Sequence, residues 1–290
     1  QNKHFGKHQE CNTRCLIDKV TRFEDEHKHP MNIDSMTADD LRVFADFLSS
    51  DYDISMNTIV TNMTLMRTVC NWVRKQGVTN NDPFFGYDMP KALYGTPYFL
   101  TIQERDQVLD ADLTDDAELA EYRDMFVFQC MVGCRHSDLV TFTPKNIIDG
   151  VLEYIPIKTK GKLGDVVRVP LIPKAMAILD GHDHGDDEPI FPKHYNFKFN
   201  DAIRRILKRA KVNRVVTVIN PKTRLEEKKP ISDVATSHLA RRTFIGNLYR
   251  MVKDPDLVAS MSGHAKGSVA FARYRVIDDD MKKSLVELIQ

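Results

Sequence analysis

Apolar residues in the N-terminal third of the chain recur at the spacing of amphipathic helices. Leu41, Phe44 and Leu48 lie three and four residues apart, so they share one face of a helix. Thr37 precedes them and is a residue type that caps helix N-termini. Residues 56–75 repeat the apolar spacing at greater length and are followed by a glycine, which commonly ends a helix. The pattern predicts a small helical domain.

Prolines and glycines interrupt this pattern between residues 83 and 98, which predicts a linker. We therefore expect two domains, a helical one over residues 1–92 and a second one over residues 93–290. Helical spacing returns in the second domain at several places, namely from residue 101 onward and over residues 115–133, 173–179, 199–210, 237–252, 255–261 and 268–274.

Short β segments are predicted among these helices. Asp149-Gly150 stands between two apolar pairs and is a strong signal for a tight hairpin turn. We expect strands over residues 154–157 and 166–171, joined by a turn rich in Lys and Gly, and a further hairpin within residues 215–229. The expected fold class is mainly α with a small β-sheet and hairpins.

The charged side chains are balanced in total number but unevenly distributed along the chain. The chain has 41 Lys and Arg against 41 Asp and Glu. Residues 96–150 carry 4 basic and 11 acidic side chains, whereas residues 201–290 carry 19 basic and 10 acidic ones. A basic last third is typical of a surface that faces a polyanion, although an unevenly charged, solvated surface gives the same count.

Composition excludes two classes of protein. The longest apolar stretch, Met125 to Val132, is far shorter than the roughly 20 residues that span a bilayer, and the N-terminal residues contain no apolar run of the kind found in secretory signals. The five cysteines are sparse and odd in number, which favours reduced thiols. Reduced thiols favour a cytosolic protein.

His4, His8, Cys11 and Cys15 have the residue types of a zinc site. If this stretch is helical, His4 and Cys15 are about 16 Å apart at 1.5 Å per residue. Ligands of one zinc ion lie about 2.0 to 2.3 Å from the metal and cannot span that distance. We therefore expect no metal at this position.

Short motifs in the second domain carry residues suited to phosphate chemistry. Arg135 follows a helix-ending glycine and precedes Ser-Asp, a helix start. His238 and Arg241 lie three residues apart at another helix start, and therefore on one face. His264 follows a glycine, and Tyr274 ends the next helical pattern. Singly, each has an ordinary explanation as an ion pair, a helix cap or a packed ring.

The order of these residues resembles the tyrosine recombinases, also called the phage integrase family. Arg135 comes first, followed by a Lys in a β-hairpin turn, His238-x-x-Arg241, Gly-His264 and Tyr274. The surrounding motifs Gly-Cys-Arg-His-Ser-Asp-Leu and Phe-Ala-Arg-Tyr look most like integrases of mobile elements such as conjugative transposons. The resemblance implies a SAM-like core-binding domain followed by a catalytic domain.

The resemblance also implies a metal-free and cofactor-free reaction. Arg135 and Arg241 would neutralise the phosphate, which suits planar, bidentate guanidinium groups. His238 would accept the proton of Tyr274, the nucleophile that forms a 3′-phosphotyrosyl intermediate, while His264 donates a hydrogen bond to the phosphate. No ATP is needed, because the intermediate conserves the energy of the phosphodiester bond.

The general acid of the family is a Lys in the hairpin turn, and its position here depends on how the turn is counted. Counting forward from the Asp-Gly turn selects Lys158, and counting back from the second strand selects Lys162. We choose Lys158, with Lys160 and Lys162 as alternatives that otherwise contact the DNA backbone. The interval from His264 to Tyr274 is one residue longer than the common pattern.

The resemblance implies that the partner is double-stranded DNA with recombination sites, in the bacterial cytoplasm or nucleoid. It also implies a homo-oligomer that forms a four-subunit synapse on this DNA. A DNA-bending accessory protein is a further expected partner. The C-terminal tail is expected to form a short helix with an apolar face, which would dock on a neighbouring protomer or pack on its own domain. Other candidate DNA contacts are basic side chains: Arg204, Arg205, Lys208, Arg209, Lys211, Arg242, Lys266, Arg273 and Arg275.

Two other functions fit parts of this pattern. A type IB topoisomerase-like enzyme would use the same chemistry as a monomer, and a DNA-binding regulator could keep the fold without catalysis. The complete set of candidate catalytic side chains argues against the regulator. Integrases of this family often have an additional N-terminal domain that binds arm-type sites, and the sequence shows no such domain, so we expect a trimmed chain.

Overall fold

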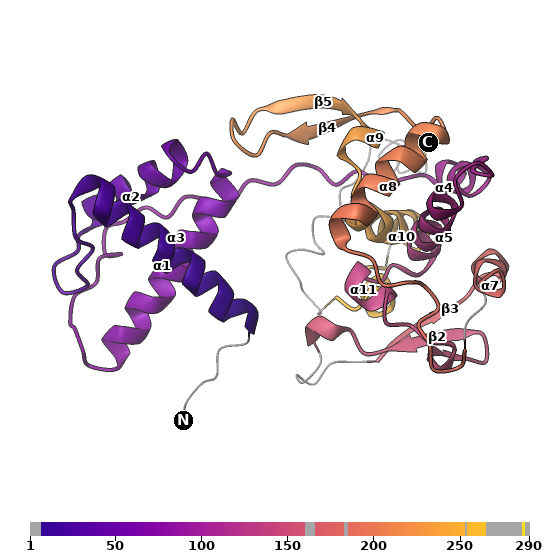
Figure 1. Cartoon of the computed structure of the whole chain (residues 1–290), viewed down its shortest axis with the longest axis horizontal. Coiled ribbons are helices and arrows are strands. Elements are labelled where there is room, and N and C mark those ends of the chain that lie inside the picture. The colour runs from indigo at the N-terminus through magenta and orange to yellow at the C-terminus, as the bar shows by residue number, and fades with distance from the viewer. Residues whose placement is uncertain (1–6, 160–165, 183–184, 253, 265–285, 288–290) are drawn as a thin grey trace. The chain divides into compact units, whose positions relative to one another are not determined.

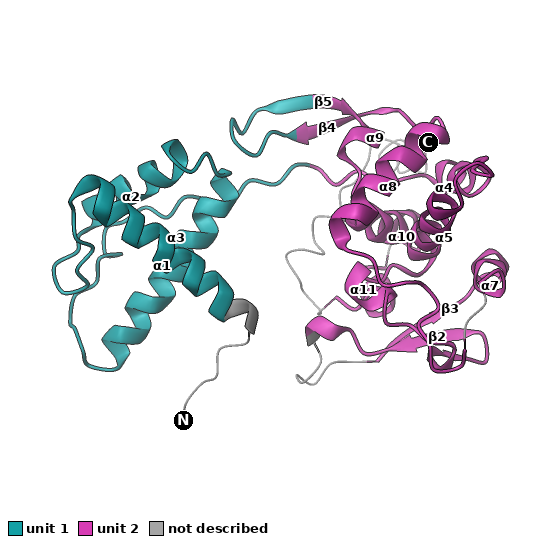
Figure 2. Cartoon of the chain, viewed as in Figure 1, with its two compact units in different colours: residues 1–95, 219–227 teal, residues 96–218, 228–290 magenta. Residues whose placement is uncertain are grey.

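The computed structural model describes residues 7–159, 166–182, 185–252, 254–264 and 286–287 (Figure 1). The chain divides into two compact units, one formed by residues 1–95 and 219–227 and the other by residues 96–218 and 228–290 (Figure 2). No helix among the described residues is both long and apolar enough to cross a lipid bilayer.

Unit 1 is built from three helices, α1 (Lys7–His27), α2 (Ala38–Ser50) and α3 (Met56–Lys75). The predicted cap at Thr37 is confirmed, because its side chain accepts a hydrogen bond from Asp40 N while the Asp40 carboxylate accepts one from Thr37 N. The apolar stripes of the three helices meet in one core whose side chains include Phe23, Phe44 and Met63.

The tip of the hairpin formed by β4 (Val215–Ile219) and β5 (Glu226–Pro230) belongs to unit 1. Met56 N donates a hydrogen bond to Pro221 O at 3.2 Å, and the Cβ of a residue replacing Gly95 would lie 3.2 Å from the Ile219 side chain. This hairpin was predicted from the sequence, but all of it was expected in the second domain. Spacing along the chain cannot reveal a long-range docking of this kind.

Unit 2 is organised around α5 (Ala117–Val132), whose residues from Met125 to Val132 are all buried, and α10 (Ser237–Val252) packs against it. Phe126 and Phe128 are fully buried in the same core as Ile245 of α10. The other helices of this unit are α4 (Ile102–Leu109), α6 (His136–Leu139), α7 (Pro173–Asp180), α8 (Asn196–Arg209), α9 (Ile231–Val234) and α11 (Pro255–Ser262), with 3₁₀ turns η1 (Pro144–Asn146) and η2 (Ile157–Thr159).

An antiparallel sheet in the order β1-β2-β3 completes the described part of unit 2, formed by β1 (Ile147–Ile148), β2 (Val151–Tyr154) and β3 (Val167–Pro170). Asp149 and Gly150 form the predicted tight turn, since both have positive φ and the flanking Ile148 pairs with Val151. The expected strand over residues 154–157 is wrong: the strand follows the turn directly and ends at Tyr154, because Pro156 has no N–H to continue the ladder.

All five cysteines are free thiols. Cys11 and Cys15 are exposed on α1, and the other three are buried. Within the described ranges, no three His, Cys, Asp or Glu side chains converge as a metal site requires, and His4 lies outside those ranges. The predicted helix over residues 268–274 also lies outside them.

Candidate active site

A pocket of about 370 Å³ opens in unit 2 where α5 ends and α6, α8 and α10 begin. It contains three of the residues singled out from the sequence, Arg135, His238 and Arg241. We call it the arginine pocket and define it by its lining residues: Gln129, Cys134, Arg135, His136, Ser137, Asn196, Ser237, His238 and Arg241.

The turn that carries Arg135 depends on Gly133. This glycine ends α5 in the left-handed conformation with φ of 69°, and its N–H donates to Gln129 O. A Cβ at this position would lie 2.2 Å from the Phe244 ring of α10. Only glycine therefore allows α5 and α10 to approach this closely while the chain turns toward Arg135.

Arg241 lies at the floor of the pocket and is only 1% exposed. Its Nη1 donates to the carbonyl oxygen of Gly133 at 2.7 Å, and its Nη2 lies 3.0 Å from His264 Nδ1. The structure thus brings together residues from the end of α5, from α10 and from the turn after α11. A buried guanidinium carries a fixed positive charge, which favours an anion in the pocket.

His264 follows α11, which ends at Gly263 in the left-handed conformation. Burial, reinforced by the charges of Arg241 and Arg135, lowers the pKa of His264 to about 3. Ser262 Oγ lies 2.9 Å from its Nδ1. The imidazole is therefore neutral at physiological pH, and a neutral imidazole can donate one N–H while its other nitrogen accepts.

His238 lies on the first turn of α10 and lines the pocket. The preceding Ser237 is fixed twice, because its N–H donates to Asn200 Oδ1 at 2.7 Å and its hydroxyl donates to Asn196 Oδ1 at 3.1 Å. These two bonds tie the start of α10 to the start of α8. They fix the backbone from which the His238 side chain projects.

Arg135 is partly exposed, and its Nη1 is buried without a hydrogen-bond partner among the described residues. Its backbone caps α6, with Arg135 O accepting from Asp138 N at 2.9 Å. A buried N–H that finds no partner costs free energy, and an anion in the pocket would satisfy it.

Lys158 lies in the 3₁₀ turn η2 and is exposed. Asp138, 2% exposed, holds this turn, because its Oδ1 accepts from Ile157 N at 2.9 Å. Lys158 is also among the charges that lower the pKa of His264. Its ammonium therefore acts electrostatically on the same site, whereas Lys160 and Lys162 lie outside the described residues.

The candidate nucleophile Tyr274 lies outside the described residues, as do Lys266, Arg273 and Arg275. The arginine pocket, His264 and Lys158 account for the other candidate catalytic positions. Two pocket residues were missed from the sequence although signals existed. Gln129 is the one strongly polar residue in an apolar run, and Asn196 starts a helix.

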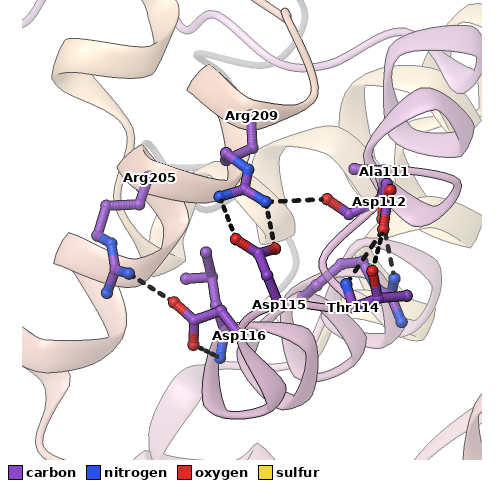
Figure 3. Close-up of polar contacts among 9 residues, drawn as sticks. Ala111, Asp112, Thr114, Asp115, Asp116, Arg205 and Arg209 are labelled. Atoms are coloured by element: carbon purple, nitrogen blue, oxygen red, sulfur yellow. Dashed lines mark hydrogen bonds and ion pairs between the residues drawn. The ribbon is translucent and has the colours of Figure 1, made fainter.

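Three basic residues near the end of α8 have close carboxylate partners within the unit. Arg205 pairs with Asp116 at 2.7 Å and Arg209 pairs with Asp115, in a cluster between the end of α8 and the start of α5 (Figure 3). Lys208 pairs with Asp233 at 2.8 Å. These ion pairs must break before the three cations can contact a phosphate.

Three further candidate DNA contacts are described, with different surroundings. Arg204 Nη1 lies 3.8 Å from Asp201 Oδ1, a long and weak ion pair. Arg242 lies over the ring of Tyr98, 5.2 Å from its centroid, as in a cation–π contact. Lys211 has a positive φ of 57° just after α8 and is exposed.

Comparison with solved structures shows that the chain has the fold of integrases. The Tn1549 transposon integrase (residues 82–397) in complex with circular intermediate DNA is similar with a TM-score of 0.72 at 15% identity, covering 99% of this chain and 95% of that one. A lambda integrase (residues 75–356) dimer bound to a COC′ core site gives a TM-score of 0.68 at 14% identity, covering 96% and 91%. A lambda integrase tetramer bound to a Holliday junction gives 0.63 at 13%, covering 96% and 74%.

The sequence was also compared with curated proteins and with models of sequence families. No curated protein matches the chain significantly. Residues 2–89 match the phage integrase SAM-like domain, and residues 98–281 match the phage integrase family itself. The second match covers well over half of the sequence and includes every residue of the arginine pocket. The chain belongs to the phage integrase family.

Proposed function

We propose that the protein is a site-specific DNA recombinase that cuts and rejoins strands through a 3′-phosphotyrosyl intermediate, and that it integrates or excises a mobile element. One observation carries this proposal: Arg135, His238 and Arg241 line one pocket, and His264 lies within hydrogen-bonding distance of Arg241. Carboxylates are absent from the described lining of this pocket. Such a site favours a phosphodiester over a cation.

Phosphate binding is the first step. The guanidinium groups of Arg135 and Arg241 bind the nonbridging oxygens of the scissile phosphate, where negative charge builds up in the transition state. His264 is neutral and donates its N–H to the same group. Because the donors are already in place, little reorganisation is needed when the charge develops.

Attack on phosphorus requires a deprotonated phenol. Tyrosine has a pKa of about 10, so a base must remove the proton as the bond forms. His238 accepts that proton, and Tyr274 Oη forms a bond to phosphorus. The bond from phosphorus to the 5′-oxygen breaks, and Lys158 protonates the departing oxygen. The reverse sequence, with a 5′-hydroxyl from another strand as nucleophile, rejoins the DNA.

Recombination requires two sites and therefore several protomers. Lambda integrase has been solved as a tetramer on a Holliday junction, and the Tn1549 integrase with its circular intermediate DNA. By analogy this chain acts as a homo-oligomer, with four subunits in the synapse, on the DNA ends of a mobile element. A DNA-bending accessory protein would help to assemble that complex.

A nicked suicide substrate tests the proposal. Cleavage of such a duplex releases a short strand, which traps the protein–DNA adduct as a band that resists denaturant. Tyr274→Phe should abolish the band and leave DNA binding unchanged, because only the hydroxyl is lost. Tyr249→Phe, a change of the same kind on α10, should leave the band intact. The absence of an adduct with the unaltered chain would refute the proposal.

A type IB topoisomerase-like activity would also yield the adduct. The two functions differ in what happens next, since relaxation needs one site on one duplex and recombination needs two. We expect recombinant products from two-site plasmids and little relaxation of a plasmid without a site. Efficient relaxation of a site-free plasmid, without recombinants, would favour the topoisomerase.

A further inference from the structure

Gln129 is an unusual residue for its position. It lies on α5 in a run of buried residues from Met125 to Val132 and is itself only 1% exposed. Burying an amide side chain costs free energy unless its polar atoms find partners, whereas Leu or Met would fill the same space without that cost. The polarity of this residue therefore needs a reason, and it lines the arginine pocket.

The amide of Gln129 holds the turn that leads to Arg135. Its Nε2 donates to the carbonyl oxygen of Cys134 at 3.0 Å. The preceding carbonyl, that of Gly133, accepts from Arg241 Nη1 at 2.7 Å. Two successive peptide groups are thus fixed by side chains from two different helices, directly before the residue whose guanidinium must meet the phosphate.

The guanidinium of Arg135 lacks an anchor of this kind. Its Nη1 is buried without a hydrogen-bond partner in the part of the chain that the structure describes. Its direction is therefore set mainly by the backbone of the turn. Gln129 Oε1 is a second buried polar atom without a described partner, so the amide has no competing bond that would pull it from Cys134.

We propose that Gln129 is a positioning residue for DNA cleavage, which acts through the Cys134 carbonyl to fix the direction of Arg135. The proposal rests on the recombinase function proposed above. A loose turn would let the guanidinium sample directions away from the phosphate, and small errors of position in a catalytic group are costly in rate. Gln129→Met keeps the volume and removes the hydrogen bond.

Cleavage kinetics give the first test. With saturating protein on the nicked substrate, we expect Gln129→Met to lower the rate of adduct formation by roughly 10- to 100-fold. Gln129→Asn, which keeps an amide but is one methylene shorter, should have the same effect and serves if the Met variant fails to fold. Thr243→Val is the matched control: it removes another buried hydrogen-bonding side chain, which accepts from Leu100 N at 3.0 Å and lies outside the pocket.

A binding measurement separates positioning from a general loss of structure and needs no cleavage. In the Tyr274→Phe background, the protein should bind a duplex with a normal scissile phosphate more tightly than one with a neutral methylphosphonate there. Gln129→Met should bring that ratio of affinities toward one, while Thr243→Val leaves it unchanged even if it lowers the melting temperature.

The outcomes are distinguishable. If the unaltered chain forms no adduct, the proposed function fails. If the unaltered chain forms the adduct and Gln129→Met and Gln129→Asn cleave at its rate, the positioning role is refuted. Slow cleavage with an unchanged affinity ratio, or a ratio that Thr243→Val shifts equally, would also refute it, because the effect would then be structural.

Discussion

At the scale of single residues, the site depends on backbone geometry as much as on charged groups. Gly133 combines a positive φ of 69° with a Cβ position 2.2 Å from Phe244, so both conformation and space require glycine. We expect Gly133→Ala to destabilise the fold by about 2 to 4 kcal/mol, through strain and overpacking together, and to abolish cleavage. Gly150 has a φ of 75° but open space around it, so Gly150→Ala should cost only about 1 kcal/mol. Chemical denaturation of both variants measures the difference, and equal losses would contradict this explanation.

The lowered pKa of His264 predicts that the stability of the folded protein depends on pH. Its pKa is lowered from the ordinary value of 6.5 to about 3 in the folded protein, mainly by burial. Below pH 6.5 the unfolded chain binds a proton that the folded chain does not, so this residue makes the free energy of unfolding decrease as pH falls toward 3. In His264→Gln the decrease between pH 7 and pH 5 should be smaller than in the unaltered chain. Thermal melts across that range provide the measurement, and parallel pH profiles would count against the lowered pKa.

At the scale of helices, the ion pairs at the end of α8 point to a structural role for these cations. Arg205 and Arg209 connect α8 to Asp116 and Asp115, directly before α5 (Figure 3). We expect Arg205→Ala to leave DNA affinity within about twofold, because an arginine already paired with a carboxylate gains little by exchanging it for a phosphate. Arg242→Ala, which removes a cation without a described carboxylate partner, should weaken binding more. Fluorescence anisotropy with a labelled duplex gives both affinities, and a larger loss for Arg205→Ala would restore α8 as a DNA contact.

Some features of the helices and turns can be predicted from the sequence, and others cannot. Caps and turns depend on neighbouring residues, so the cap at Thr37 and the Asp149-Gly150 turn were predicted correctly. Ion pairs such as that of Arg205 with Asp116 join residues 89 positions apart and have no local signature. Gln129 was missed although its partner Cys134 is only five residues away, because a sequence does not show which carbonyl oxygen a buried amide reaches. The candidate catalytic residues were predicted from the resemblance of their order along the chain to that of a family. The structure adds how the turn at Gly133 and the α8–α10 contact position those it describes.

At the scale of the whole molecule, charge is balanced in total and uneven along the chain. The balance of 41 cations against 41 anions means that attraction to DNA depends on local basic surfaces rather than on net charge. Each phosphate contact releases counterions, so affinity should fall with salt on the order of 10³-fold between 50 and 200 mM if six or more phosphates are contacted. Tyr274→Phe should be used, so that binding is measured without covalent capture. Melting temperatures over the same range should change little, because a chain with zero net charge has little self-repulsion to screen. A salt-independent affinity would mean that phosphates are not the main contacts, and the function proposed for the arginine pocket would then lose its support.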